Sequence, residues 1–399
     1  MKIEKRKNMN NFFGIDKETL EKKKSFNTAK EILQQPKLWK ETLEIFRNSE
    51  KSLKEYFKKI GFGKEFDIVF TGAGTSEYVG NILEPLLNKN ETGEFKSIAT
   101  TDILNNPLSY MKKNKKTLVV SFARSGDSPE SMAVVKIANE NIKDIYHLFI
   151  TCNKEGALAK SSIDNENTFM LLMPEKSNDK GFAMTSSFSC MLLSGILAFS
   201  KNSKEVIKEM KKIIALAEKE LENKYVTIRQ IAEQDHKRIV ILGSGILKGL
   251  AQELSLKVME LSAGKIVSTS NSTLGFRHGP KAIVNEETIV FELINQNQYA
   301  KKYDEGLLEE MYEDKTADKL VAYCIETSEK IEKNTNESVA PEIEEKINNN
   351  ELYSLFIYLI YGQMYAFFKS QYLGNTTDNP FPTGEVNRVV KKFKIHEFN

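Results

Sequence analysis

A short unit made of an apolar strand, a glycine-containing turn and a helix recurs along this chain and constrains its fold more than any other feature. Residues 118–131 read LVVSFARSGDSPES, in which an apolar run suited to a buried parallel strand leads into a hydroxyl-rich turn and then a helical pattern. Residues 68–87 and 238–263 follow the same order, with GAG and GSG at the turn. Repeated units of this kind predict parallel sheets covered by helices.

The unit is also repeated at the scale of a domain. The stretch LGSGILKGLAQE echoes TGAGTSEYVGNI, which stands about 170 residues earlier. We therefore expect an α/β protein with two doubly wound parallel-sheet lobes that arose by duplication, and a boundary between them near residues 200–225. The expected division is a helical segment over 1–50, a first lobe over 51–205, and a second lobe with a C-terminal tail over 206–399.

Further apolar runs complete the two predicted sheets. In the first lobe we expect strands at residues 98–101, 146–152 and 168–173. In the second lobe we expect strands at residues 265–268, 288–293 and 322–327. The apolar stretch 352–368 is too short and too polar for a convincing membrane span, so it predicts a buried helix.

Composition excludes several classes of function. The chain of 399 residues has 57 Lys+Arg and 55 Asp+Glu, and a net charge of +2 gives no electrostatic footprint for nucleic acid. Cys152, Cys190 and Cys324 are scattered without metal-ligand spacing, which indicates buried thiols in a reducing cytosol. The basic N-terminus lacks the apolar core of a secretory signal. We expect a cytoplasmic protein without a membrane or nucleic-acid partner and without a metal.

The turn over residues 121–128 has the chemistry of a phosphate cradle. A helix start offers unpaired backbone N–H groups and the positive end of its dipole. Ser125 and Ser128 add hydroxyl groups, Arg124 adds a fixed positive charge, and Gly126 allows a tight turn. The alternative is an ordinary helix cap at Ser128. The P-loop pattern is absent, so nothing here requires a nucleotide or Mg²⁺.

The turn GAGTS at residues 72–76 follows another predicted strand. By itself this turn is half of a dinucleotide fingerprint, because the full GxGxxG pattern is missing. In a parallel sheet, however, this turn and the one over 121–128 both lie at the carboxyl ends of strands, where ligands collect. The pair of turns therefore strengthens the prediction of a phosphate site.

The predicted helix over 247–263 carries titratable side chains on one face. Glu253, Lys257 and Glu260 are spaced by four and three residues, which can equally make a solvated ladder of ion pairs. Downstream, His278 stands in a loop bracketed by glycine and proline and beside a hydroxyl-rich stretch. A lone histidine is usually structural, but this setting makes His278 a candidate acid or base.

Several of these motifs together resemble a known family. The chain is similar to tandem sugar isomerase (SIS) domain proteins in TGAGTS, VVSFARSGDSPES, FAMTSSFS, LGSGILKGLAQELSLKVMELSAGKI and LGFRHGPKAIV. The resemblance is strongest to the tagatose-6-phosphate ketose/aldose isomerase family, also described as galactosamine-6-phosphate deaminase/isomerases. That likeness rests on TAKEILQQPKLW, on the arginine in SFARSG and on the ending TTDNPFPTGEVNRVVKKFKIH. The isomerase half of glucosamine-6-phosphate synthase is a more distant relative.

The resemblance implies roles for individual residues. Glu260 matches the glutamate that moves a proton between C1 and C2, and His278 matches the histidine that assists ring opening, often across a dimer interface. Lys257 and Glu253 match supporting charged positions. The implied substrate-binding residues are Gly74, Thr75, Ser76, Ser121, Arg124, Ser125, Ser128, Thr185, Ser186 and, as the nearest counterpart of a C-terminal lysine in the synthase, Lys391. Ala123 and Arg124 replace a serine and a glutamine of the synthase, so the phosphate or a hydroxyl is held differently.

The resemblance also implies an activity. The expected enzyme is a homodimer or higher homo-oligomer that converts galactosamine 6-phosphate to tagatose 6-phosphate and ammonia through an enolamine, without a metal or redox cofactor. The glutaminase domain of the synthase has no counterpart here, which favours ammonia release over synthesis. The alternatives are a plain aldose–ketose isomerase, a glucosamine-6-phosphate deaminase, and a sugar-phosphate-binding regulator. The presence of both Glu260 and His278 argues against the regulator.

Overall fold

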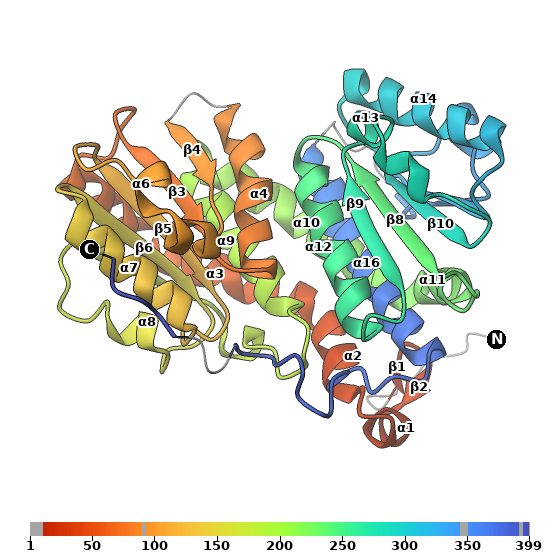
Figure 1. The fold of residues 1–399 in the computed structure, drawn as a ribbon, viewed down its shortest axis with the longest axis horizontal. Coiled ribbons are helices and arrows are strands. Elements are labelled where there is room, and N and C mark those ends of the chain that lie inside the picture. Colours follow the sequence, from red (N-terminus) through yellow and green to blue (C-terminus); the bar gives the residue numbers. More distant parts are fainter. Residues whose placement is uncertain (1–10, 90–92, 344–349, 391–393, 399) are drawn as a thin grey trace.

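Two separate parallel sheets organise the molecule. In the computed structural model, which describes residues 11–89, 93–343, 350–390 and 394–398, the five-stranded sheets have the orders β4-β3-β5-β6-β7 and β12-β11-β10-β8-β9. Every strand pair within them is parallel. Helices lie on both faces of each sheet, and the sheets stand side by side (Figure 1). The predicted two-lobed α/β architecture is confirmed.

The first sheet reverses direction at its centre. Its strands are β3 (Asp67–Thr71), β4 (Glu94–Ser97), β5 (Thr117–Ala123), β6 (Ile145–Thr151) and β7 (Thr168–Leu172). The central strands β3 and β5 are buried along their whole length, which explains their nearly continuous apolar sequences. The chain passes from β3 outward to β4 and returns to β5 on the other side. The point between β3 and β5 is therefore the topological switch point, where α/β sheets bind ligands.

The second sheet repeats this topology. Its strands are β8 (Arg238–Gly243), β9 (Val267–Asn271), β10 (Thr288–Leu293), β11 (Lys319–Tyr323) and β12 (Glu337–Val339). The turns after β3 and β8 match closely, with Gly74 at φ 57°, ψ −126° and Gly245 at φ 60°, ψ −127°. Both glycines sit at a positive φ that other residues rarely adopt. The repeat seen in the sequence is thus a repeat of backbone geometry.

Long helices fill the space between the sheets. They are α3 (Gln35–Ile60), α4 (Thr75–Asn88), α9 (Ser186–Phe199), α10 (Ser203–Asn223), α11 (Tyr225–Ala232), α12 (Ile246–Leu261) and α16 (Glu351–Tyr372). Helix α12 packs against α4 of the first lobe and against α16, and the three lie together in the centre (Figure 1). Gly249 allows this approach, because a Cβ there would lie 2.8 Å from Ile82 Cγ1. The first-lobe turn and the helix with the predicted acid–base residues are therefore in contact.

The remaining elements cover the outer faces and the termini. They are β1 (Asn11–Phe12), β2 (Ile15–Asp16), α1 (Lys17–Lys22), α2 (Phe26–Leu33), α5 (Thr100–Asn105), α6 (Pro107–Tyr110), α7 (Pro129–Asn141), α8 (Ala157–Lys160), α13 (Thr273–Phe276), α14 (Gln298–Asp314) and α15 (Glu329–Lys333), with short 3₁₀ turns at Glu175–Ser177 and Pro280–Ile283. Helix α16 is buried almost throughout, as expected. In the described ranges, no helix has the length and apolarity needed to cross a membrane.

Several predicted elements differ from the structure, and the strand expected at 265–268 lies slightly later, at Val267–Asn271. The strand expected at 98–101 is wrong. The strand in this region is β4, which ends at Ser97, and helix α5 begins at residue 100. Strand β4 is an edge strand whose side chains are only partly covered, so EFKS lacks the apolar run that marks a buried strand. The strand expected at 322–327 lies earlier, at Lys319–Tyr323. Helix α3 continues to Ile60, so no break in secondary structure marks residue 50.

Candidate active site

The two predicted phosphate turns line a common cavity at the switch point of the first sheet. This cavity has a volume of about 130 Å³. Its polar lining consists of the hydroxyl groups of Ser76, Ser125, Ser128 and Ser131 and the side chains of Arg124 and Arg388. Helices α4 and α7 both begin at these turns. Hydroxyl donors, positive charge and helix starts in one place suit an anion such as phosphate.

Ser125 and Ser128 of the second turn line the cavity, and their hydroxyl groups also accept hydrogen bonds from the backbone. Ser128 Oγ accepts a hydrogen bond from Ser131 N at 3.2 Å, so Ser128 is the N-cap of α7. Ser125 Oγ accepts from Asp127 N at 3.3 Å. In both bonds the serine oxygen is the acceptor. The cap and the phosphate cradle are therefore compatible interpretations of this turn.

Arg124 is buried and holds two neighbouring segments by their backbone. Its Nη1 donates to Phe182 O at 3.1 Å, and its Nη2 donates to Arg388 O at 2.7 Å. Burial, with the nearby charge of Arg388, lowers the pKa of Arg124 to about 10. The guanidinium still carries its charge at neutral pH.

The acid–base residues of α12 meet the first-lobe turn at Thr75. Lys257 Nζ donates to Thr75 Oγ1 at 2.8 Å and lies 2.5 Å from Glu260 Oε2 and 3.6 Å from Glu253 Oε1. The side chains of Lys257 and Glu253 are 1% and 0% exposed. The interpretation of this face as a solvated ladder therefore does not hold. Glu260, at 24% exposed, is the member of the group that reaches solvent.

Burial sets the charge distribution in this cluster. It raises the pKa of Glu253 to about 8, with Lys257 opposing the shift and Glu260 adding to it. Neither carboxyl oxygen of Glu253 lies in hydrogen-bonding geometry with a described residue. Burial alone would lower the pKa of Lys257, but the neighbouring carboxyl groups of Glu253 and Glu260 more than offset this effect, and the pKa is raised. At neutral pH the arrangement is a protonated Glu253 behind an ammonium group that pairs with Glu260.

Tyr78, in the first turn of α4, is part of the same cluster and was missed by the sequence analysis. Its pKa is raised to about 12, mainly by burial and further by the neighbouring charges of Glu77, Glu253 and Glu260. The phenol therefore keeps its proton at neutral pH. Its position three residues after Thr75, on the helix that starts at the turn, was the only signal in the sequence.

Other predicted substrate-binding residues lie away from the cavity lining. Thr185 Oγ1 donates to Asp179 Oδ1 at 3.3 Å, and Ser186 Oγ donates to Glu31 O at 2.8 Å, so both hydroxyl groups have protein partners. Ser121 is buried within β5. Gly74 and Thr75 form the start of α4 beside the cavity. Lys391 lies outside the described residues.

His278 is not brought to this cluster within one chain. It is exposed on the loop after α13, and its backbone N–H donates to Gly275 O at 3.1 Å. No hydrogen bond or ion pair between described residues joins it to Lys257 or Glu260. Ion pairs of Arg277 and Lys281 with Glu310, at 2.8 and 2.6 Å, fix the loop to α14.

The corresponding edge of the second lobe lacks the chemistry of an anion site. Ile246 and Leu247 stand where the first lobe has Thr75 and Ser76, and both are buried. Behind them, Thr273 Oγ1 donates to Glu292 Oε1 at 2.6 Å. A carboxyl group in place of hydroxyl donors is unsuited to phosphate. Among the described residues, the candidate anion site is therefore the one formed by the first-lobe turns beside helix α12.

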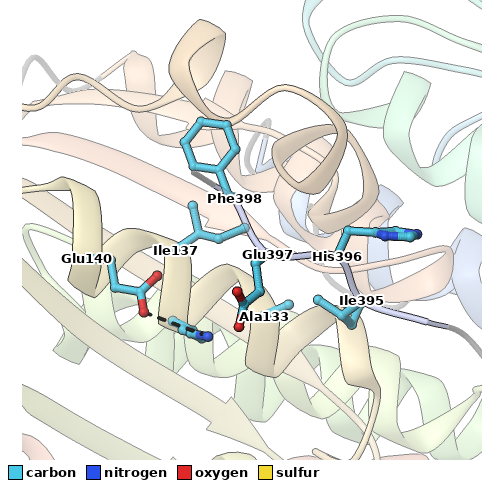
Figure 2. A pocket seen from close by; sticks show the side chains of 8 residues that line it. Ala133, Ile137, Glu140, Ile395, His396, Glu397 and Phe398 are labelled. Carbon is cyan, nitrogen blue, oxygen red and sulfur yellow. Dashed lines mark ion pairs between the residues drawn. The ribbon is translucent and has the colours of Figure 1, made fainter.

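A larger cavity lies elsewhere on the first lobe. It has a volume of about 520 Å³ and is formed where the end of the chain crosses α7 (Figure 2). Glu140 pairs with Lys136 at 3.8 Å on its floor, and both are exposed, as are His396 and Glu397 on the tail. This cavity has no buried titratable group and is not a better candidate for chemistry.

The two parallel-sheet lobes have the architecture of tandem SIS domains. The chain belongs to the SIS domain family, whose model matches residues 63–201 and 233–366.

More specific relatives cover nearly all of both chains. The D-galactosamine-6-phosphate deaminase AgaS of Shewanella sp. (strain ANA-3) is 37% identical over 377 residues, which cover 94% of this chain and 92% of the relative. A solved structure of tagatose-6-phosphate ketose/aldose isomerase from Escherichia coli has a TM-score of 0.83 at 34% identity, covering 93% of this chain and 96% of that one. A solved structure from Clostridium novyi NT has a TM-score of 0.94 at 44% identity, covering 97% and 99%.

Proposed function

We propose that this protein is a deaminating isomerase that converts galactosamine 6-phosphate and water to tagatose 6-phosphate and ammonia. The relatives named as galactosamine-6-phosphate deaminase and tagatose-6-phosphate isomerase support this proposal. The observation that carries it is the bridge from Thr75 through Lys257 to Glu260. It sets a carboxylate beside the turn that suits the phosphate group.

The reaction follows from this placement. With the phosphate at the first-lobe turns, the open-chain amino aldose extends toward α12, and Glu260 removes the proton from C2 to give an enolamine. The same carboxyl group returns this proton to the adjacent C1, while over the two steps the C1 oxygen gains a proton and the C2 nitrogen loses one. The product is a ketimine, and water hydrolyses its C=N bond to the ketose and ammonia. No redox change occurs.

Lys257 has two roles in this scheme. Its ammonium group holds Glu260 in place, and we assign to it the stabilisation of the negative charge that develops on the C1 oxygen during proton removal. Glu253 sits behind it, fully buried, with Oε1 3.6 Å from the ammonium nitrogen. We therefore assign Glu253 to positioning and Glu260 to proton transfer.

We propose that ring opening depends on His278 of a second copy of the chain. In one chain this residue is exposed, and no hydrogen bond or ion pair between described residues joins it to Glu260. Exposed apolar side chains occur on α12, β9 and α13, namely Met259, Val267 and Leu274. They supply apolar area for a contact between copies. A homodimer would complete the site.

We also propose two general properties of the protein. One is the division of the chain at residues 50 and 205, and the other is a cytoplasmic location. Cys152, Cys190 and Cys324 are unpaired and buried, which supports a reducing compartment.

The test is product formation from the two hexosamine 6-phosphates. We expect ammonia and tagatose 6-phosphate from galactosamine 6-phosphate, with much slower release from glucosamine 6-phosphate. Faster release from the gluco substrate would establish the glucosamine-6-phosphate alternative. Interconversion of aldose and ketose phosphates without ammonia from either amine would establish the plain isomerase. Binding without turnover would establish the regulator.

A further inference from the structure

The C-terminal segment 376–390 returns from the second lobe to the first and crosses the phosphate cavity (Figure 1). It is anchored at Asp378 and Phe381. Asp378 accepts hydrogen bonds from Asn27 N at 2.9 Å and from Thr28 N at 2.8 Å, at the start of α2. Phe381 packs on Phe182 with ring centroids 5.4 Å apart. The segment is therefore a built part of the first lobe.

The segment places Arg388 in the lining of the cavity. Arg388 lines it together with the hydroxyl groups of the phosphate turns. Its Nη2 donates to Asn178 Oδ1 at 3.2 Å and to the carbonyl oxygen of Asp179. Among the described residues, no carboxylate forms an ion pair with Arg388, and its Nε and Nη1 have no hydrogen-bond partner. Donors with a full charge thus stay available at the cavity.

Arg124 has a different set of contacts. It is 7% exposed, and its Nη1 and Nη2 each donate to a backbone carbonyl, one of which is that of Arg388. Arg124 is therefore hydrogen-bonded to the backbone of the C-terminal segment at Arg388. The two guanidinium groups are close enough for their charges to interact. An anion in the cavity would relieve that repulsion.

We propose that Arg388 binds the phosphate group of the substrate, and that Arg124 is a positioning residue that holds Arg388 by its backbone. The charge at the phosphate site then comes from the C-terminal segment, and the serines of the turns supply neutral donors. This inference rests on the proposed function only for the identity of the sugar. The binding of a phosphate group by Arg388 is independent of the reaction.

The test is the binding of inorganic phosphate, measured by titration calorimetry at low and high salt, with the KM for galactosamine 6-phosphate measured in parallel. Arg388→Met removes the charge. Arg388→Gln removes it but keeps an amide donor for Asn178 and Asp179, so the segment stays in place. Arg388→Lys keeps the charge. Arg47→Met, at a surface arginine paired with Glu44, is the matched control.

We expect Arg388→Met and Arg388→Gln to weaken phosphate binding about 10- to 100-fold at low salt, the effect of one lost charge-assisted hydrogen bond. The loss should shrink at high salt because screening weakens the wild-type contact. KM should rise by a similar factor with a smaller change in kcat, Arg388→Lys should lose less, and Arg47→Met should bind as the wild type does. Wild-type phosphate affinity in Arg388→Gln at low salt would overturn the inference.

The outcomes separate the inference from the proposed function. If the wild type binds phosphate through Arg388 but releases no ammonia from either hexosamine phosphate, the proposed function fails and the inference stands. If ammonia is released while Arg388→Gln binds phosphate and substrate normally, the inference fails and the function stands.

Discussion

Lys257 Nζ, on a helix of the second lobe, donates a hydrogen bond of 2.8 Å to Thr75 Oγ1, the first residue of the helix that follows the first-lobe turn. Through this contact helix α12 of the second lobe and the first-lobe turns form one site. Lys257 also lies within 4 Å of Glu260 and Glu253, at 2.5 and 3.6 Å. The lysine is therefore the centre of both the interface and the chemistry.

Replacing Lys257 by Met should damage stability and activity together. The change leaves Glu260 without the ammonium group that orients it and Thr75 Oγ1 without its donor. Breaking a buried ion pair from one side costs about 3–5 kcal/mol, so the free energy of unfolding in urea should fall by that order. Lys248→Met, at an exposed lysine of the same helix, is the control and should change neither quantity. A stable, active Lys257→Met protein would contradict this account.

The two serines of the phosphate turn should give different phenotypes. Ser125→Ala removes a cavity hydroxyl and should raise KM about 10-fold or more with little loss of stability. Ser128→Ala should raise KM and also cost about 1 kcal/mol of stability, because Ser128 caps α7. Ser328→Ala, at a serine that caps α15 in the second lobe, should cost stability alone. Equal KM values in all three variants and the wild type would place the phosphate elsewhere.

Glu31 should make stability fall as pH rises. Burial and the neighbouring carboxylates of Asp179 and Asp378 raise the pKa of Glu31 from 4.5 to about 8. Between these values the folded protein holds a proton that the unfolded chain releases, so the free energy of unfolding decreases with increasing pH in this window. Glu31→Gln keeps an acceptor for Lys180 N and Gly181 N and has no proton to lose.

Thermal unfolding from pH 5 to pH 8 checks this expectation. The melting temperature of Glu31→Gln should decline less across the window than that of the wild type. Glu41→Gln, at a glutamate on α3, is the control and should follow the wild-type curve. Parallel curves for Glu31→Gln and wild type would show that Glu31 does not titrate there.

Mixing two inactive variants should restore activity if His278 acts across subunits. In a hybrid dimer of Glu260→Gln and His278→Asn chains, one site carries both changes and the other carries neither. Equal mixing with full subunit exchange should then return about a quarter of wild-type activity. Activity no greater than the sum of the separate variants would show that His278 acts within its own chain or not at all.

The elements that the sequence predicted well are those with local signals. Gly74 and Gly245 have the positive φ that their turns require, and the apolar runs of β3 and β5 are central strands. Edge strand β4 was missed because half-covered side chains leave no apolar run. Local pattern was therefore sufficient for the core of each lobe but not for its edges.

The contacts that complete the site could not be predicted because they join distant segments. The motifs TAKEILQQPKLW, SFARSG and TTDNPFPTGEVNR each looked specific, but only the structure shows that Thr28 meets Asp378 and that Arg124 meets Arg388. Arg124 was predicted to hold substrate, and its partners turn out to be backbone carbonyl groups. Nothing in the sequence relates residue 388 to the turn at 125.

The most direct test of the mechanism is exchange of the substrate C2 proton with solvent deuterium, followed by NMR at neutral pH. Glu260→Gln should bind galactosamine 6-phosphate nearly as the wild type does, yet lose exchange by a factor on the order of 10²–10⁴. Glu253→Gln is the matched control. It resembles the protonated form of Glu253 favoured by burial, and should keep most of the exchange rate. Near wild-type exchange in Glu260→Gln, with loss in Glu253→Gln, would show that Glu253 is the base and contradict the account.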